Sequence, residues 1–189
     1  MTSPANPLRL RLRAISPNDA AAITHFLAGD TELALQTATI PIPYTIEVAR
    51  DFLRAADPRQ IFAITVADDL VGLIGMIGPA GMFGAQHHSE IPAQPPDELH
   101  TQTSVQPLEV GYWVGRIHWG RGYATSALRL LIEEARRRQI SRLTADVLPN
   151  NPASIRVLEN NGFVCQGEIQ RDLPQRGGLR RLLHFHREL

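Results

Sequence analysis

The sequence has little cysteine, no net charge and no long apolar run, and each absence excludes a class of protein. Its single cysteine, Cys165, excludes an internal disulfide framework and is typical of a reducing compartment. Basic and acidic side chains number 19 each, so no long-range field draws the chain to nucleic acid or to an anionic membrane. No apolar run approaches the roughly 20 residues that span a bilayer, and the N-terminus lacks a signal peptide's apolar core. We expect a cytoplasmic protein without nucleic-acid or membrane partners.

The apolar pattern alternates between the periods of strands and helices along a chain whose length suits one domain, residues 1–189. Strands are predicted at residues 8–14, 60–67, 70–77, 108–114, 142–147, 163–170 and 179–187. Helices are predicted at residues 16–29, 45–56, 125–138 and 151–162. This order predicts one α/β domain with three layers, in which helices flank a mixed sheet.

Residues 79–107 break this alternation, because they are rich in Gly, Pro, Gln and His and have no sustained period. Loops longer than about 15 residues are uncommon unless they are functional or disordered. We interpret the segment as a flexible insertion between two strands, with a lid over the substrate site as the alternative. Its histidines, His87, His88 and His100, match no zinc spacing and have no cysteine beside them, so no metal site is expected.

Residues 119–124, with the sequence WGRGYA, lie between a predicted strand and a predicted helix. Two glycines separated by one residue let consecutive backbone N–H groups turn toward one point, and the helix N-terminus behind them adds partial positive charge. An ordinary tight turn has the same pattern. The motif that follows downstream favours a phosphate-binding loop.

That second motif is residues 151–163, with the sequence NPASIRVLENNGF. The loop and this N-x-A-S-x-R-V-L-E-x-x-G-F pattern together resemble the GNAT acetyltransferase superfamily, in particular the branch that acetylates ribosomal-protein N-termini. Gly122 and Ala124 take the small positions of that family's phosphate loop, and Trp119 takes the first position. Residues 8–13, 41–45 and 109–113 extend the match. The resemblance implies a three-layer α/β/α fold with a mixed, mostly antiparallel sheet that is splayed at the cofactor site.

The resemblance also implies acetyl-CoA as co-substrate, without a metal. The backbone of the loop is expected to bind its pyrophosphate, through Trp119, Gly120, Arg121, Gly122, Tyr123 and Ala124. The strand before the loop is expected to pair with the pantetheine amides as if a further strand were added, at Val110, Tyr112, Trp113 and Val114. Asn151 is expected both to cap the next helix and to contact the pantetheine.

A transferase of this kind must remove a proton from its amine acceptor. By resemblance, Glu109 is predicted to be the base, directly or through water; a surface position or an ion pair is the alternative. Leu158 stands where many GNAT enzymes have a tyrosine, so Ser154 is expected to donate a hydrogen bond to the leaving thiolate. Its alternative role is to stabilise the first turn of a helix. Tyr44 is expected beside the acceptor channel, or to pack against neighbouring prolines.

The sequence therefore predicts an acetyl-CoA-dependent N-acetyltransferase that works by direct transfer in a ternary complex, as a monomer or homodimer. The acceptor is a protein N-terminal α-amine or a small amine such as a polyamine, amino acid or antibiotic. A non-catalytic acyl-CoA sensor is the rival hypothesis. Two departures leave the acceptor open: Ser126 replaces a glutamate of the branch, and the last strand lacks its acidic residue. Cys165 follows Phe163 and Val164 in a strand pattern and is interpreted as a core residue rather than a nucleophile.

Overall fold

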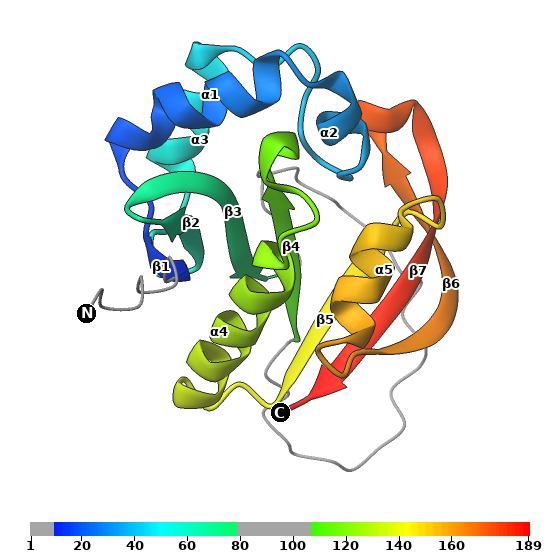
Figure 1. Cartoon of the computed structure of the whole chain (residues 1–189). Coiled ribbons are helices and arrows are strands. Elements are labelled where there is room, and N and C mark those ends of the chain that lie inside the picture. Colours follow the sequence, from blue (N-terminus) through cyan, green and yellow to red (C-terminus); the bar gives the residue numbers. More distant parts are fainter. Residues whose placement is uncertain (1–9, 79–106) are drawn as a thin grey trace, which may run out of the picture.

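The fold is known from a computed structural model that describes residues 10–78 and 107–189. In these residues seven strands form one sheet, in the order β1-β2-β3-β4-β5-β7-β6 (Figure 1). Their bounds are β1 Leu10–Ala14, β2 Ile61–Val66, β3 Asp69–Ile77, β4 Leu108–Val114, β5 Arg142–Val147, β6 Val164–Leu173 and β7 Gly178–Glu188. Every neighbouring pair is antiparallel except β4 and β5. The mixed, mostly antiparallel sheet predicted from the resemblance is confirmed.

The parallel strands β4 and β5 diverge soon after they meet. Their pairing covers Leu108 with Leu143 and Glu109 with Thr144, and no further residues. Beyond Glu109, β4 stays paired with β3, while β5 stays paired with β7 on its other side. Each strand therefore has an edge without a strand partner where the two part, which is the predicted splay (Figure 1).

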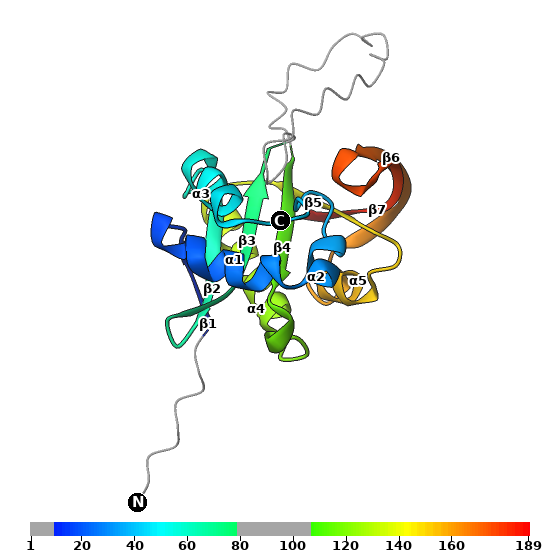
Figure 2. The same ribbon diagram turned by 90° about the horizontal axis from the view of Figure 1, so that it is seen from above.

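In the described part of the chain, five α-helices lie on the two faces of the sheet, which gives the predicted three layers. Their bounds are α1 Ala20–Ala28, α2 Thr31–Leu35, α3 Ile46–Ala55, α4 Tyr123–Arg137 and α5 Pro152–Glu159. Helices α1 to α3 share one buried cluster with sheet residues such as Leu73 and Trp113. Helices α4 and α5 share a second cluster with residues such as Ile74 and Phe185. The first group lies nearest the viewer when the molecule is seen from above (Figure 2).

Local sequence signals explain most element boundaries. Thr45 caps α3, and its hydroxyl accepts a hydrogen bond from the Val48 N–H at 3.4 Å. Ala67 and Asp68 connect β2 to β3 with φ of 51° and 70°, which is the geometry of a primed hairpin turn. The predicted start at Pro17 is confirmed, although residues Pro17–Asp19 form a 3₁₀ turn before α1. Helix α2 was not predicted, because five residues carry too little periodicity to be recognised.

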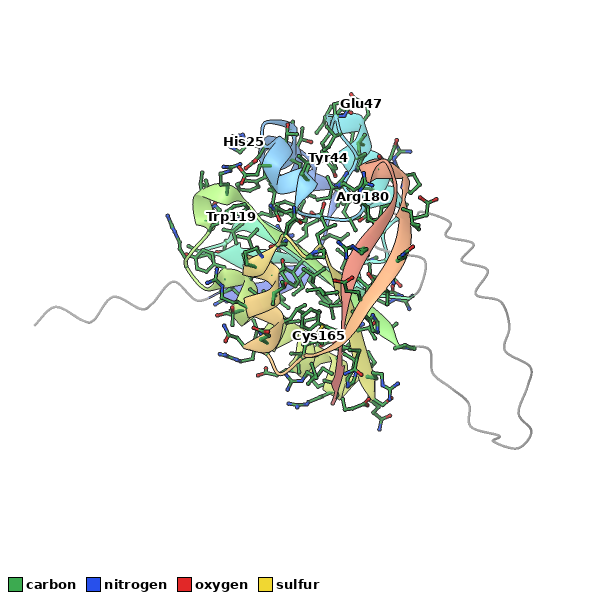
Figure 3. All side chains as sticks on the ribbon, turned by 90° about the vertical axis from the view of Figure 1, so that its right-hand side faces the viewer. His25, Tyr44, Glu47, Trp119, Cys165 and Arg180 are labelled. Carbon is green, nitrogen blue, oxygen red and sulfur yellow. The ribbon has the colours of Figure 1, made fainter. Side chains whose placement is uncertain are left out.

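The prediction that Cys165 is a core residue is wrong, because its side chain is exposed (Figure 3). It lies on β6, the edge strand of the sheet, whose first five residues are all exposed. The register with β7 also shifts between Cys165 and Gly167, as in a β-bulge, and bulges redirect side chains at sheet edges. A strand pattern alone does not reveal such an edge. Of the predicted insertion, residues 79–106 lie outside the described part of the chain.

Candidate active site

Two clefts meet where β4 and β5 diverge. The first, which we call the loop cleft, has a volume of about 630 Å³ and lies between the N-terminal ends of α4 and α5. The second, which we call the charged pocket, has a volume of about 100 Å³ and contains Glu109, Asp146 and Arg171. The residues that line both are Gln36, Thr37, Tyr112, Trp113, Asn151 and Ser154. This shared wall places a ligand of one cleft next to a ligand of the other.

Most of the predicted cofactor residues line the loop cleft. These are Tyr112, Trp113, Val114, Trp119, Gly120, Gly122, Tyr123, Ala124, Asn151 and Ser154. Val110 and the predicted base Glu109 line the charged pocket instead. The side chain of Arg121 is exposed and lines neither cleft, so any contribution of this residue to binding comes from its backbone.

The N-terminus of α4 carries no side-chain cap within the described residues. Gly122 precedes the helix with φ of 75°, and Gly120 has φ of 73°, both in the left-handed region that favours glycine. A Cβ at Gly122 would meet no protein atom within 4 Å, so the backbone conformation, rather than crowding inside the protein, requires glycine here. Tyr123, Ala124 and Thr125, which form the first turn of α4, line the loop cleft. Unsatisfied N–H groups and the helix dipole make such an end a site for an anion.

Trp119 fixes the start of the loop against the end of β4. Its indole Nε1 donates a hydrogen bond to the Val114 carbonyl at 2.6 Å. The Arg116 guanidinium lies 5.5 Å from the centre of the indole ring, within the range of a cation–π contact. Trp119, at the first position of the loop, therefore ties the loop to the end of β4.

The N-terminus of α5 is capped, as predicted for Asn151. The Ser154 N–H donates to Asn151 Oδ1 at 3.0 Å, while Asn151 Nδ2 donates to the Gln36 carbonyl at 3.2 Å. The side-chain amide of Asn151, which was expected to contact the pantetheine, thus uses one of its hydrogens to bind Gln36, the residue that follows α2. The Tyr112 hydroxyl donates to the Ser154 carbonyl at 3.2 Å, and burial raises the pKa of Tyr112, so this hydroxyl stays protonated. Ser154 lines both clefts.

A chain of four polar side chains from four strands begins in the charged pocket, where Glu109, Arg171 and Asp146 line it, and ends at His184, which contacts Asp146 but does not line the pocket. Arg171 Nη1 lies 2.9 Å from Glu109 Oε2, and Arg171 Nη2 lies 2.6 Å from Asp146 Oδ2. Asp146 Oδ1 lies 2.6 Å from His184 Nδ1. Burial raises the pKa of the Glu109 carboxyl, Arg171 opposes this rise, and the charge of Asp146 adds to it. Glu109 is therefore both a carboxylate of raised pKa in a pocket and the ion-pair partner that was its alternative role.

Arg176, at the tip of the β6–β7 hairpin, holds one wall of both clefts. Its guanidinium donates to the backbone carbonyls of Thr37 at 2.8 Å, Ala34 at 2.5 Å and Ile40 at 2.9 Å. No carboxylate of the described chain pairs with it, although only 9% of its surface is exposed. The hairpin is thereby fastened to residues 34–40, which include the shared lining residues Gln36 and Thr37.

Sequence reasoning missed Asp146, Arg171, Arg176 and His184. They come from β5, from the β6–β7 hairpin and from β7, and no local motif connects them. The one available signal was an aspartate inside the apolar alternation of β5, whose side chain proves to be 2% exposed. A buried carboxylate of this kind needs a partner.

Tyr44 lines neither cleft. It is 4% exposed and packs in the buried cluster that α1 to α3 share with the sheet (Figure 3). Its alternative role, packing against the neighbouring prolines, stays a prediction. Its hydroxyl has no hydrogen-bond partner in the described residues, and burial raises its pKa to about 12. The described contacts give no support to the predicted role of Tyr44 beside the acceptor.

Residues 10–78 and 107–189 contain neither a candidate group of metal ligands nor a candidate membrane span. No group of three or more His, Cys, Asp and Glu side chains in these ranges is placed to hold a metal ion. No helix in them is long and apolar enough to cross a bilayer. His87, His88 and His100, for which no metal was expected, lie outside the described residues.

Comparisons with known proteins agree with this geometry. YkkB of Bacillus subtilis (strain 168), an uncharacterised protein, is 40% identical over 69 residues, which cover 36% of this chain and 38% of the relative. A ribosomal-protein-serine acetyltransferase of Escherichia coli (strain K12) is 34% identical over 68 residues, covering 33% of this chain and 38% of the relative. The matched segments thus span less than half of these relatives' length.

The fold is similar to solved acetyltransferases over nearly the whole chain. The structure of Mycobacterium smegmatis RimJ in complex with CoA-disulfide matches with a TM-score of 0.70 and 24% identity, covering 97% of this chain and 86% of that one. Residues 9–164 match the model of the acetyltransferase (GNAT) domain. The resemblance predicted from the loop and the Asn151 motif is confirmed, and the chain belongs to the GNAT acetyltransferase family.

Proposed function

We propose that this chain is an acetyl-CoA-dependent N-acetyltransferase that acetylates a primary amine by direct transfer in a ternary complex. One observation carries the proposal: the loop cleft, with its uncapped helix end, and the charged pocket, with its carboxylate, share the wall that contains Ser154. Two substrates bound in these clefts would meet there. Acetyl-CoA, when bound, supplies an acetyl group activated as a thioester.

The residues of the loop cleft fit such a ligand. The left-handed Gly120 and Gly122, and the uncapped first turn of α4, provide backbone donors for a pyrophosphate. The edge of β4 beyond Glu109 has no strand partner and is suited to hydrogen-bond the two pantetheine amides. Free backbone N–H groups at this opening would also polarise the thioester carbonyl.

Glu109 is the proposed general base. As the amine nitrogen attacks the carbonyl carbon and the C–S bond breaks, the amine proton passes to Glu109 directly or through one water. Its raised pKa supports this role, because a base works best when its pKa lies near the operating pH. Ser154 is the proposed donor to the leaving thiolate, since this residue lines both clefts and no hydrogen bond found in the described residues occupies its hydroxyl.

The proposed acceptor is a protein N-terminal α-amine. The support is the segment shared with the Escherichia coli ribosomal-protein-serine acetyltransferase. A small amine such as a polyamine, amino acid or antibiotic is the alternative. Members of one fold family reuse a cofactor site with many acceptors, so the acceptor has to be measured.

The test is acetyl-CoA-dependent thiol release with a panel of N-terminal peptides, polyamines, amino acids and aminoglycosides. Calorimetry with acetyl-CoA and desulfo-CoA follows binding in parallel. The proposal is supported if thiol is released with one class of amine and if double-reciprocal plots of the initial rate give intersecting lines, as expected for a ternary complex. Acetyl-CoA binding without release for any amine favours a sensor, and absence of binding contradicts the proposal.

A further inference from the structure

Arg171 bridges the two strands of the sheet at the point where they part. Glu109 is the last residue of β4 that pairs with β5, and Asp146 lies two residues beyond its partner Thr144. Arg171 projects from β6 and reaches both carboxylates, at 2.9 Å and 2.6 Å. Its two terminal nitrogens are thus divided between a strand on each side of the divergence.

The two carboxylates differ in exposure. The Glu109 side chain is 21% exposed and lines the charged pocket, where an acceptor would reach it. The Asp146 side chain is 2% exposed and also lies 2.6 Å from His184. Burying a carboxylate as deeply as Asp146 costs free energy unless a partner compensates its charge, so Asp146 interacts strongly with Arg171. Arg171 is therefore shared between a buried carboxylate and an accessible one.

We propose that Arg171 is a positioning residue that holds Glu109 in the pocket as a carboxylate, and that Asp146, by engaging the same guanidinium, keeps Glu109 basic enough to accept a proton. The proposal rests on Glu109 acting as the base of the proposed reaction. Neither Arg171 nor Asp146 takes a proton from the substrate, so each acts through Glu109.

The charges that face Glu109 act in opposite directions. In the described chain, Arg171 on β6 favours the ionised carboxylate and lowers its pKa, as does His184 on β7 when protonated. Asp146 on β5 opposes ionisation and raises that pKa. Loss of Arg171 should therefore raise the pKa of Glu109, and loss of the Asp146 charge should lower it. A group that only supported the fold would not produce shifts of opposite sign.

The experiment measures the pH dependence of kcat/KM in Arg171→Met and Asp146→Asn, with the amine identified by the panel. Activity is lost as the pH falls through the pKa of the base. The acid limb should move up by about one pH unit in Arg171→Met and down by about half a unit in Asp146→Asn. In the free protein, carboxyl ¹³C NMR follows the Glu109 signal, identified by its absence in Glu109→Gln, and should show the same two shifts.

Two further variants serve as controls. Arg171→Lys keeps the charge and should leave the acid limb within a few tenths of a unit of the unmodified protein, which decides the question if Asp146→Asn does not fold. Arg181→Met removes an exposed arginine that pairs with Glu168 at 3.3 Å on the same hairpin. It should change neither the acid limb of the kcat/KM profile nor the titration of the Glu109 NMR signal.

The outcomes separate the two proposals. Opposite shifts in both the rate profile and the NMR titration support the positioning role. An unshifted Glu109 pKa in Arg171→Met overturns that role, while the proposed reaction stands if Glu109→Gln still lowers turnover. A Glu109→Gln variant with unchanged turnover and an unchanged acid limb shows instead that the proposed base is wrong.

Discussion

The loop cleft and the charged pocket differ in the chemical groups that they present to a ligand. The loop cleft offers backbone N–H groups from one short segment, held by two left-handed glycines and by the indole of Trp119. The charged pocket offers the side chains of Glu109, Asp146 and Arg171 from three strands, and His184 on a fourth strand contacts Asp146 from outside the pocket lining. In the proposed reaction, the loop cleft binds the cofactor that the family shares, and a fixed backbone shape suits such a ligand. The charged pocket receives the acceptor, which varies, and its side chains can change one at a time. The following variants test this division, from the largest expected effect to the smallest.

Gly122→Asp should abolish acetyl-CoA binding, with affinity reduced at least about hundredfold, or roughly 3 kcal/mol. A non-glycine residue with φ of 75° is strained, and its carboxylate would repel a phosphate at the α4 N-terminus. Calorimetry measures the affinity. Gly29→Asp is the control, because Gly29 has ordinary φ and lies outside both clefts. Retained affinity in Gly122→Asp would refute the phosphate site.

Glu109→Gln should lower kcat by about a hundredfold and leave the affinity for acetyl-CoA almost unchanged. The amide cannot accept the amine proton, and Glu109 lines the charged pocket rather than the loop cleft. Steady-state kinetics and calorimetry test the two halves of this expectation. Glu168→Gln removes an exposed carboxylate of β6 and should change neither quantity. A fall in cofactor affinity equal to the fall in kcat would contradict the division between the clefts.

Ser154→Ala should lower kcat by about tenfold, which corresponds to the loss of one hydrogen bond in the transition state, without a change in melting temperature. The cap of α5 uses the Ser154 backbone N–H and the Asn151 side chain, so the hydroxyl is not needed for the helix. Kinetics and thermal melting are measured together. A lower melting temperature with unchanged kcat would show that Ser154 stabilises the helix instead.

Asn151→Ala should destabilise the protein by about 1–2 kcal/mol and weaken acetyl-CoA binding a few-fold. It removes the α5 cap and the hydrogen bond to the Gln36 carbonyl, which joins the walls of the two clefts. Denaturant unfolding and calorimetry provide the measurements. Thr45→Ala removes the cap of α3, away from both clefts, and should destabilise without affecting affinity. Equal effects on affinity in both variants would indicate a general loss of stability.

The same division explains how much the sequence predicted. The bounds of β4 and β5, the cap by Asn151 and the glycine loop were recovered because each depends on neighbouring residues. Arg171 and His184 were missed because an arginine or a histidine in a strand looks the same in the sequence whether it faces solvent or a distant carboxylate. Arg176 was missed because it lies in the 3₁₀ turn Pro174–Arg176, where no strand or helix period marks it. Their roles depend on the order of β5, β7 and β6 in the sheet, which no local pattern encodes. Cys165 was misplaced for the same reason.

The short pairing of β4 with β5 has a consequence for association. An unpaired strand edge is a template to which another chain can add, and proteins usually protect such edges. Here the unpaired edges of β4 beyond Glu109 and of β5 beyond Thr144 lie in the middle of the sheet order, between paired strands, rather than at its rim. Residues of α4, α5 and the segment after α2 line the loop cleft beside these edges, and β3 and β7 pair with the other sides of β4 and β5. The fold thus keeps an edge open for docking without offering it for polymerisation.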